Sequence, residues 1–167
     1  KIVLAVLANP TVISMLEQAE TIQEKLEFEY NGRKIIGFMD VRAKSFIMDL
    51  KYSGKGAEIE SFQWDFKKLH YDLQGAVYCQ GVTALNLIES PDYFIMVYDA
   101  DGNVSIIKID PSYILLGIHK LDYCLQEIER CSKNNLWNSS FDFYGENDGV
   151  FTLVKPTYAN IKGSLNE

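Results

Sequence analysis

The stretch from Gly37 to Lys51, GFMDVRAKSFIMDLK, constrains the fold of this chain more than any other. It reads as two short apolar strands, 35–39 and 46–48, which are joined by a turn near residues 43–45. Because side chains alternate along a strand, Asp49 and Lys51 point to one side and Leu50 to the other. If the two strands pair, Asp40 returns beside Asp49. We therefore expect two carboxylates and an amine at one edge of a sheet.

Such a group suits metal-assisted cleavage of a phosphodiester bond. Hard cations such as Mg²⁺ bind carboxylate oxygens, and a bound metal generates a hydroxide nucleophile at neutral pH. A lysine can hold the attacking water or stabilise charge on the phosphate. The triplet D-x-K is weak alone, because Asp and Lys at strand ends are commonly solvated. Here the apolar neighbours Ile47, Met48 and Leu50 predict a strand that is at least half buried. Burying a charged side chain there costs free energy unless the charge is paired or binds a metal.

The remaining pattern predicts a single domain over residues 1–167, with an irregular tail from about residue 139. We expect helices over 12–25, 62–87 and 111–131, and strands over 26–30, 35–39, 46–51, 93–98 and 104–109. Asn31-Gly32 is the strongest hairpin signal. This order predicts an α/β fold in which a central mixed β-sheet is flanked by helices.

Charge is the main objection to a nucleic-acid partner, because the 167-residue chain has a formal net charge of -7. Half of the 16 Lys and Arg residues nevertheless fall in one central segment: Arg33, Lys34, Arg42, Lys44, Lys51, Lys55, Lys67 and Lys68. They are either a basic rim around the carboxylates or scattered solvated residues, and the sequence leaves both open. The three cysteines have no C-x-x-C spacing, which argues against a zinc site. The apolar run 2–8 is too short to span a bilayer, so we expect a cytoplasmic protein without membrane contact.

Three motifs, taken together, resemble the PD-(D/E)XK nuclease superfamily, and within it the phage and prophage exonucleases of the exodeoxyribonuclease VIII type. They are G-F-M-D at 37–40, I-M-D-L-K at 47–51 and Y-D-L-Q-G-A-V-Y at 71–78. That family shows G-x-x-D on one strand, D-x-K on the next, and a helix with Y-x-x-Q-x-A-x-Y. The likeness covers roughly residues 20–140. It implies a restriction-endonuclease-like core. It also implies that the protein is an enzyme which hydrolyses DNA in recombination and which a phage or prophage encodes.

The resemblance also implies roles for matching positions. Asp40 and Asp49 would bind Mg²⁺, for which Mn²⁺ could substitute, with the backbone carbonyl of Leu50 as a further ligand. Lys51 would be the catalytic lysine, Gln74 would orient the site, and Tyr78 would support it. An upstream acid is usual in the family; Glu24 is the best candidate, with Glu27 and Glu20 as runners-up.

A different class of function stays open, namely a binding or structural module that keeps the fold without catalysis. The presence of Asp40, Asp49, Lys51 and Gln74 together argues against it, because a degenerate site would be expected to lose some of them. A small-molecule-binding domain has no support, since the chain has no phosphate-loop or dinucleotide fingerprint. DNA is the expected partner, and a homo-oligomer or a recombination partner protein is left open.

Overall fold

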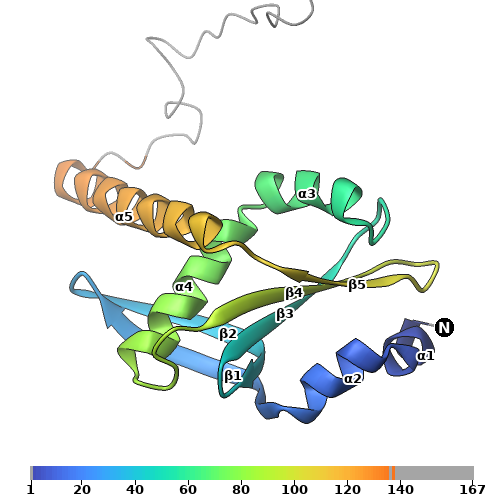
Figure 1. The fold of residues 1–167 in the computed structure, drawn as a ribbon. Helices are drawn as coiled ribbons and strands as arrows, with labels where there is room; N and C mark the ends of the chain where they lie inside the picture. The colour runs from blue at the N-terminus through green and yellow to red at the C-terminus, as the bar shows by residue number, and fades with distance from the viewer. Residues whose placement is uncertain (1, 136, 138–167) are drawn as a thin grey trace, which may run out of the picture. The chain divides into compact units, whose positions relative to one another are not determined.

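The computed structural model describes residues 2–135 and 137 (Figure 1). Residues 1–126 form one compact unit, and a second unit comprises residues 127–167. In chain order the elements are α1 (Ile2–Ala8), α2 (Pro10–Glu17), β1 (Ala19–Tyr30), β2 (Arg33–Ala43), β3 (Phe46–Tyr52), α3 (Ile59–Lys68), α4 (Tyr71–Ala84), β4 (Asp92–Tyr98), β5 (Val104–Lys108) and α5 (Pro111–Asn134). Among the described residues, no helix is long and apolar enough to cross a membrane. The predicted tail from about residue 139 lies outside the described residues.

The five strands form one mixed sheet in the order β1-β2-β3-β4-β5. β1, β2 and β3 are antiparallel neighbours, β3 and β4 are parallel, and β4 and β5 are antiparallel. The parallel pair requires a crossover connection, which α3 and α4 supply. The predicted α/β fold with a mixed sheet flanked by helices is therefore confirmed.

Two apolar cores cover the two faces of the sheet. Ile47 and Ile95 pack with residues of α3 and α4, such as Phe62 and Val82. Their strand neighbours Met48 and Met96 pack on the opposite face with Val12 and Met15 of α2. This division follows from the alternation of side chains along each strand. In Figure 1, α1 and α2 accordingly lie on one side of the sheet, and α3 and α4 on the other.

The hairpin of β1 and β2 turns at Asn31 and Gly32, whose φ angles of 48° and 70° are both positive. Two consecutive positive φ angles are typical of the turn that joins two strands with a two-residue loop. The regular alternation of side chains is interrupted farther along β2. Met39 belongs to the core beneath α4, whereas Val41, two residues later, belongs to the core beneath α2. Asp40 lies between them, where the strand passes from one core to the other.

Two expected helices differ from the structure. The helix predicted over 12–25 ends at Glu17, and β1 begins at Ala19. Local helical spacing is overridden there by pairing with β2, in which Ile22 lies opposite Val41. The helix predicted over 62–87 is two helices, separated at residues 69–70, where His70 has a φ of +54°. This break lets α3 and α4 leave in different directions, so that both can pack on the same core.

Candidate active site

The candidate site lies where β2 and β3 separate. The two strands pair in register only at Val41 with Met48 and at Arg42 with Ile47. The next residues outward are Asp40 and Asp49. The Asp40 carboxylate Oδ2 accepts a hydrogen bond from the backbone N–H of Leu50 at 2.8 Å, in the place of a ladder carbonyl. The structure thus brings Asp40 beside Asp49, the neighbourhood that the sequence pattern predicts.

Asp49 is the buried centre of the site, with only 2% of its surface exposed. Its Oδ2 forms an ion pair with the Lys51 ammonium, which lies on the same face of β3. Its Oδ1 accepts a hydrogen bond from Gln74 Nε2 of α4 at 3.3 Å. Burial raises the pKa of Asp49, and the nearby Asp40 carboxylate raises this pKa further, whereas Lys51 opposes both effects. The negative charge on Asp49 is therefore only partly compensated.

A relay of hydrogen bonds holds Gln74 in place. Gln74 Nε2 also donates to the hydroxyl of Tyr78, one helical turn later, at 3.0 Å. That hydroxyl donates in turn to the backbone carbonyl oxygen of Phe38 at 2.6 Å. Burial is the main cause that raises the pKa of Tyr78, so the hydroxyl keeps its proton at neutral pH and can act as this donor. The relay ties α4 to β2 on one side and to Asp49 of β3 on the other.

Gly37 makes this relay possible. A Cβ atom at residue 37 would lie 2.9 Å from Cε1 of the Tyr78 ring, closer than two carbon atoms normally approach. The glycine of the G-F-M-D motif therefore provides the space through which the Tyr78 ring reaches β2.

Lys51 has a second neighbour that the sequence analysis gave no role. Its Nζ lies 4.7 Å from the centroid of the Tyr71 ring, at the start of α4. Tyr71 stands three and seven residues before Gln74 and Tyr78, a helical spacing that places all three on one side of α4. Tyr71 is also the first tyrosine of the Y-x-x-Q-x-A-x-Y motif, which is the signal in the sequence that could have identified it.

Glu24 has other partners in this structure. Its carboxylate accepts hydrogen bonds from Arg42 Nε at 2.7 Å and from the Thr21 hydroxyl at 2.6 Å. Glu20 also binds Arg42, through Nη1 at 2.7 Å, and the side-chain hydrogen bond to Arg42 is the main cause that lowers the pKa of Glu24. Glu27 forms ion pairs with Lys25 and Lys34. The identity of an upstream acidic ligand, and the use of the Leu50 carbonyl, stay predictions.

The basic rim is smaller than the sequence suggests. Arg42 is only 8% exposed and its guanidinium is bound to two glutamates, so its inclusion in an open basic surface is wrong. Lys34 and Lys55 form ion pairs with Glu27 and Asp65. The remaining exposed lysines of the segment are Lys44, Lys67 and Lys68.

The chemistry of these side chains fits a hard divalent cation. Two carboxylates lie side by side, and burial together with mutual repulsion disfavours the charge on Asp49. A cation held between them would offset both effects, and carboxylate oxygens are the ligands that Mg²⁺ and Mn²⁺ accept. In the part of the chain that the structure describes, no group of three or more His, Cys, Asp or Glu side chains could hold a metal ion. A metal here would thus rest on two carboxylates, with backbone or water oxygens as the other ligands.

The sequence matches no protein-family model and no curated protein. Among solved structures, it is similar to a crystal structure from Eubacterium rectale of a protein described as a candidate exonuclease, with a TM-score of 0.68 at 19% identity. The match covers 97% of this chain and 64% of the other, so the chain spans less than two thirds of that protein's length. A weaker match is to the protein SSO0001, with a TM-score of 0.37 at 19% identity. It covers 70% of this chain and 55% of the other, and nothing is inferred from it. The chain therefore shares its fold with a protein described as a candidate exonuclease.

Proposed function

We propose that this chain is a Mg²⁺-dependent deoxyribonuclease of the PD-(D/E)XK type, an exonuclease of phage or prophage origin that acts in recombination. One observation carries the proposal. Asp49 contacts Lys51 of its own strand and Gln74 of α4 where β2 and β3 separate. The Asp40 carboxylate of β2 accepts a hydrogen bond from the backbone N–H of Leu50, the residue between Asp49 and Lys51. The shared fold with a protein described as a candidate exonuclease supports the same class of reaction.

Asp40 and Asp49 are the residues that would hold the metal. A bound Mg²⁺ supplies Lewis-acid chemistry, since it polarises phosphoryl oxygens and lowers the pKa of water. Lys51 places a positive charge beside this centre, where it stabilises negative charge on the phosphate or orients the attacking water. Gln74 fixes the orientation of the Asp49 carboxylate, and Tyr78 fixes Gln74.

DNA would reach the site across a surface of mixed charge. Lys44 lies in the turn between β2 and β3, and Lys67 and Lys68 lie at the end of α3. These exposed lysines can contact phosphates, while the acidic remainder of the surface repels them. We therefore expect weaker and less salt-sensitive binding than a uniformly basic enzyme would show, because fewer phosphate contacts release fewer counterions.

The test is an incubation of purified protein with linear and with covalently closed circular duplex DNA, in Mg²⁺ or in EDTA. The proposal predicts release of nucleotides from the linear DNA alone, only with Mg²⁺. Asp49→Asn should abolish release, whereas Asp101→Asn, the same change in the exposed turn between β4 and β5, should preserve it. Cleavage of the circle would contradict exonuclease action. Binding of DNA without any cleavage would favour the non-catalytic module.

A further inference from the structure

The ammonium of Lys51 lies between two partners of different chemistry. One is the Asp49 carboxylate, with which it forms an ion pair. The other is the face of the Tyr71 ring, whose centroid is 4.7 Å from Nζ. A cation at this distance from an aromatic face is attracted by the electron density of the ring. The Lys51 side chain is only 16% exposed, so water screens this attraction weakly.

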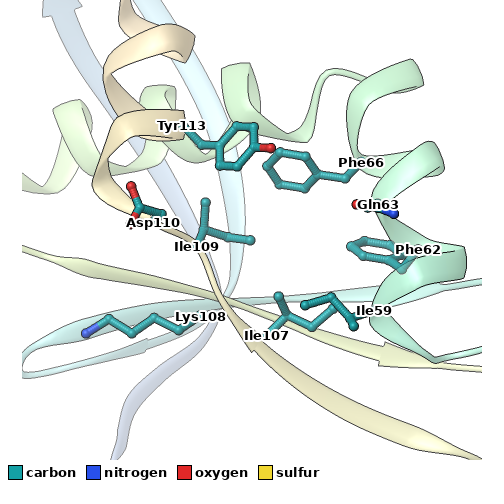
Figure 2. A pocket seen from close by; sticks show the side chains of 9 residues that line it. All are labelled: Ile59, Phe62, Gln63, Phe66, Ile107, Lys108, Ile109, Asp110 and Tyr113. Atoms are coloured by element: carbon teal, nitrogen blue, oxygen red, sulfur yellow. The ribbon is translucent and has the colours of Figure 1, made fainter.

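Packing against α3 fixes the Tyr71 ring. Phe62 stacks on it with centroids 5.8 Å apart and planes 16° apart, and Phe66 meets it edge-on at 6.4 Å. Tyr113 at the start of α5 packs edge-on against Phe66 at 5.1 Å. Figure 2 shows Phe62, Phe66 and Tyr113 around a cavity of about 190 Å³. The ring that faces Lys51 is thus the partly buried member of a packed aromatic cluster whose other rings, Phe62 and Phe66, are buried.

The attraction comes from the ring face and not from a phenolate charge. Burial raises the pKa of Tyr71, and the carboxylates of Asp49 and Asp65 raise it further, so the phenol keeps its proton at neutral pH. Phenylalanine presents the same face without the hydroxyl, and should serve equally well at this position.

The two partners of Lys51 differ in what happens when Asp49 binds a cation. A divalent ion would compete with the ammonium for the Asp49 oxygens and would repel it. The Tyr71 ring attracts the ammonium without using a carboxylate, so its contribution persists.

We propose that Tyr71 is a positioning residue, which keeps the Lys51 ammonium beside the site while the Asp49 carboxylate binds a divalent cation; this inference rests on the proposed nuclease function. The pair of contacts on Lys51, one ionic and one aromatic, is the observation that assigns this role. The cluster of Phe62 and Phe66 is the support that fixes the ring.

The contact itself is tested on the protein without metal or DNA. An aromatic ring current shifts the protons next to a lysine ammonium upfield in the NMR spectrum, and the Lys51 signal is identified by its loss in Lys51→Arg. We expect this shift in the parent and in Tyr71→Phe, and its disappearance in Tyr71→Leu. A Lys51 signal in the parent that coincides with that of the exposed Lys44 would overturn the proposal.

The role is tested by single-turnover cleavage of linear DNA at saturating protein and Mg²⁺. The cleavage rate of Tyr71→Phe should stay within about twofold of the parent rate, and that of Tyr71→Leu should be lower by about 5- to 30-fold. At 1.36 kcal/mol per factor of ten, this decrease corresponds to about 1–2 kcal/mol. The matched control Tyr52→Leu should stay within about twofold, because the Tyr52 ring packs against Tyr98 and not against Lys51. 3,4,5-Trifluorophenylalanine at position 71 keeps the shape of the ring but removes the electron density from its face. It should be nearly as slow as leucine, even if Tyr71→Leu folds poorly.

The outcomes separate this inference from the function on which it rests. A trifluoro variant as fast as the parent, or a Tyr71→Phe variant as slow as Tyr71→Leu, overturns the role of the ring face in an enzyme that still cleaves. A parent protein that cleaves no DNA overturns the proposed function and the catalytic role together, while the ring-current shift reports on the contact by itself.

Discussion

Removal of one hydroxyl group, in Tyr78→Phe, tests the relay that ties α4 to both strands of the site. The hydroxyl is the donor to the Phe38 carbonyl at 2.6 Å and the acceptor from Gln74 at 3.0 Å, and Tyr78 is only 7% exposed. Each hydrogen bond contributes about 1 kcal/mol net, and a buried partner left unpaired adds to the loss. We expect the free energy of unfolding to fall by about 2 kcal/mol. For a folded unit of this size that is a decrease in melting temperature of roughly 8 °C, at about 4 °C per kcal/mol.

The assay is thermal unfolding followed by circular dichroism, with Tyr52→Phe as the matched control. Tyr52 is 55% exposed, so its change should stay within about 0.5 kcal/mol. A double-mutant cycle between Tyr78→Phe and Gln74→Leu should give a coupling of about 0.5–3 kcal/mol, because the two side chains share a hydrogen bond. If Tyr78→Phe has the same melting temperature as the control Tyr52→Phe, or if the coupling energy is zero, the relay does not form. The argument that Tyr78 holds Gln74 in place would then also be wrong.

Three other changes test the electrostatics and packing around the site. Because the pKa of buried Asp49 is raised, the folded protein binds a proton at this carboxylate more tightly than the unfolded chain does. Stability should therefore fall as the pH rises from the unfolded pKa of about 3.9 through the folded pKa of Asp49. Asp49→Asn should remove that fall and raise the melting temperature of the metal-free protein at pH 7. Gly117→Ala should destabilise by about 1–3 kcal/mol in urea unfolding, because its Cβ would fall on the Asp72 carbonyl oxygen of α4, and an unchanged midpoint would refute that close approach. Lys120→Met should destabilise the protein by about 1–3 kcal/mol, because it leaves the Asp72 carboxylate, which is 2% exposed, without its ion pair. The control Lys108→Met breaks an exposed ion pair and should change the stability by less than about 1 kcal/mol. Equal effects of the two substitutions would contradict the argument.

The parts of the fold that are predictable from sequence are those in which local signals and tertiary packing agree. Asn31-Gly32 allows only a tight hairpin, and the alternation in β3 places Asp49 and Lys51 on one face. Their meeting with Asp40 follows from a short turn between adjacent strands. Local sequence thus predicts the meeting of Asp40, Asp49 and Lys51, whereas the role of Gln74 is implied only by the family resemblance.

The remaining features depend on long-range packing that local periodicity does not encode. Residues 19–25 have helical spacing and form a strand because β2 offers a partner to most of them. Nothing in the local pattern places a left-handed residue at His70, which divides the predicted long helix. The burial of Arg42 against Glu20 and Glu24 likewise needs the register of β1 and β2. Charge counting along the sequence therefore overestimates the basic surface.

The central claim is that Asp40 and Asp49 together hold a divalent cation. Crystals of the protein soaked in Mn²⁺ and measured near the manganese absorption edge test it directly, since only manganese gives a strong anomalous peak there. Our account predicts a peak between the two carboxylates, lost in Asp49→Asn and kept in Asp101→Asn. Crystals that show no peak at this site, or an equal peak in Asp49→Asn, would contradict it.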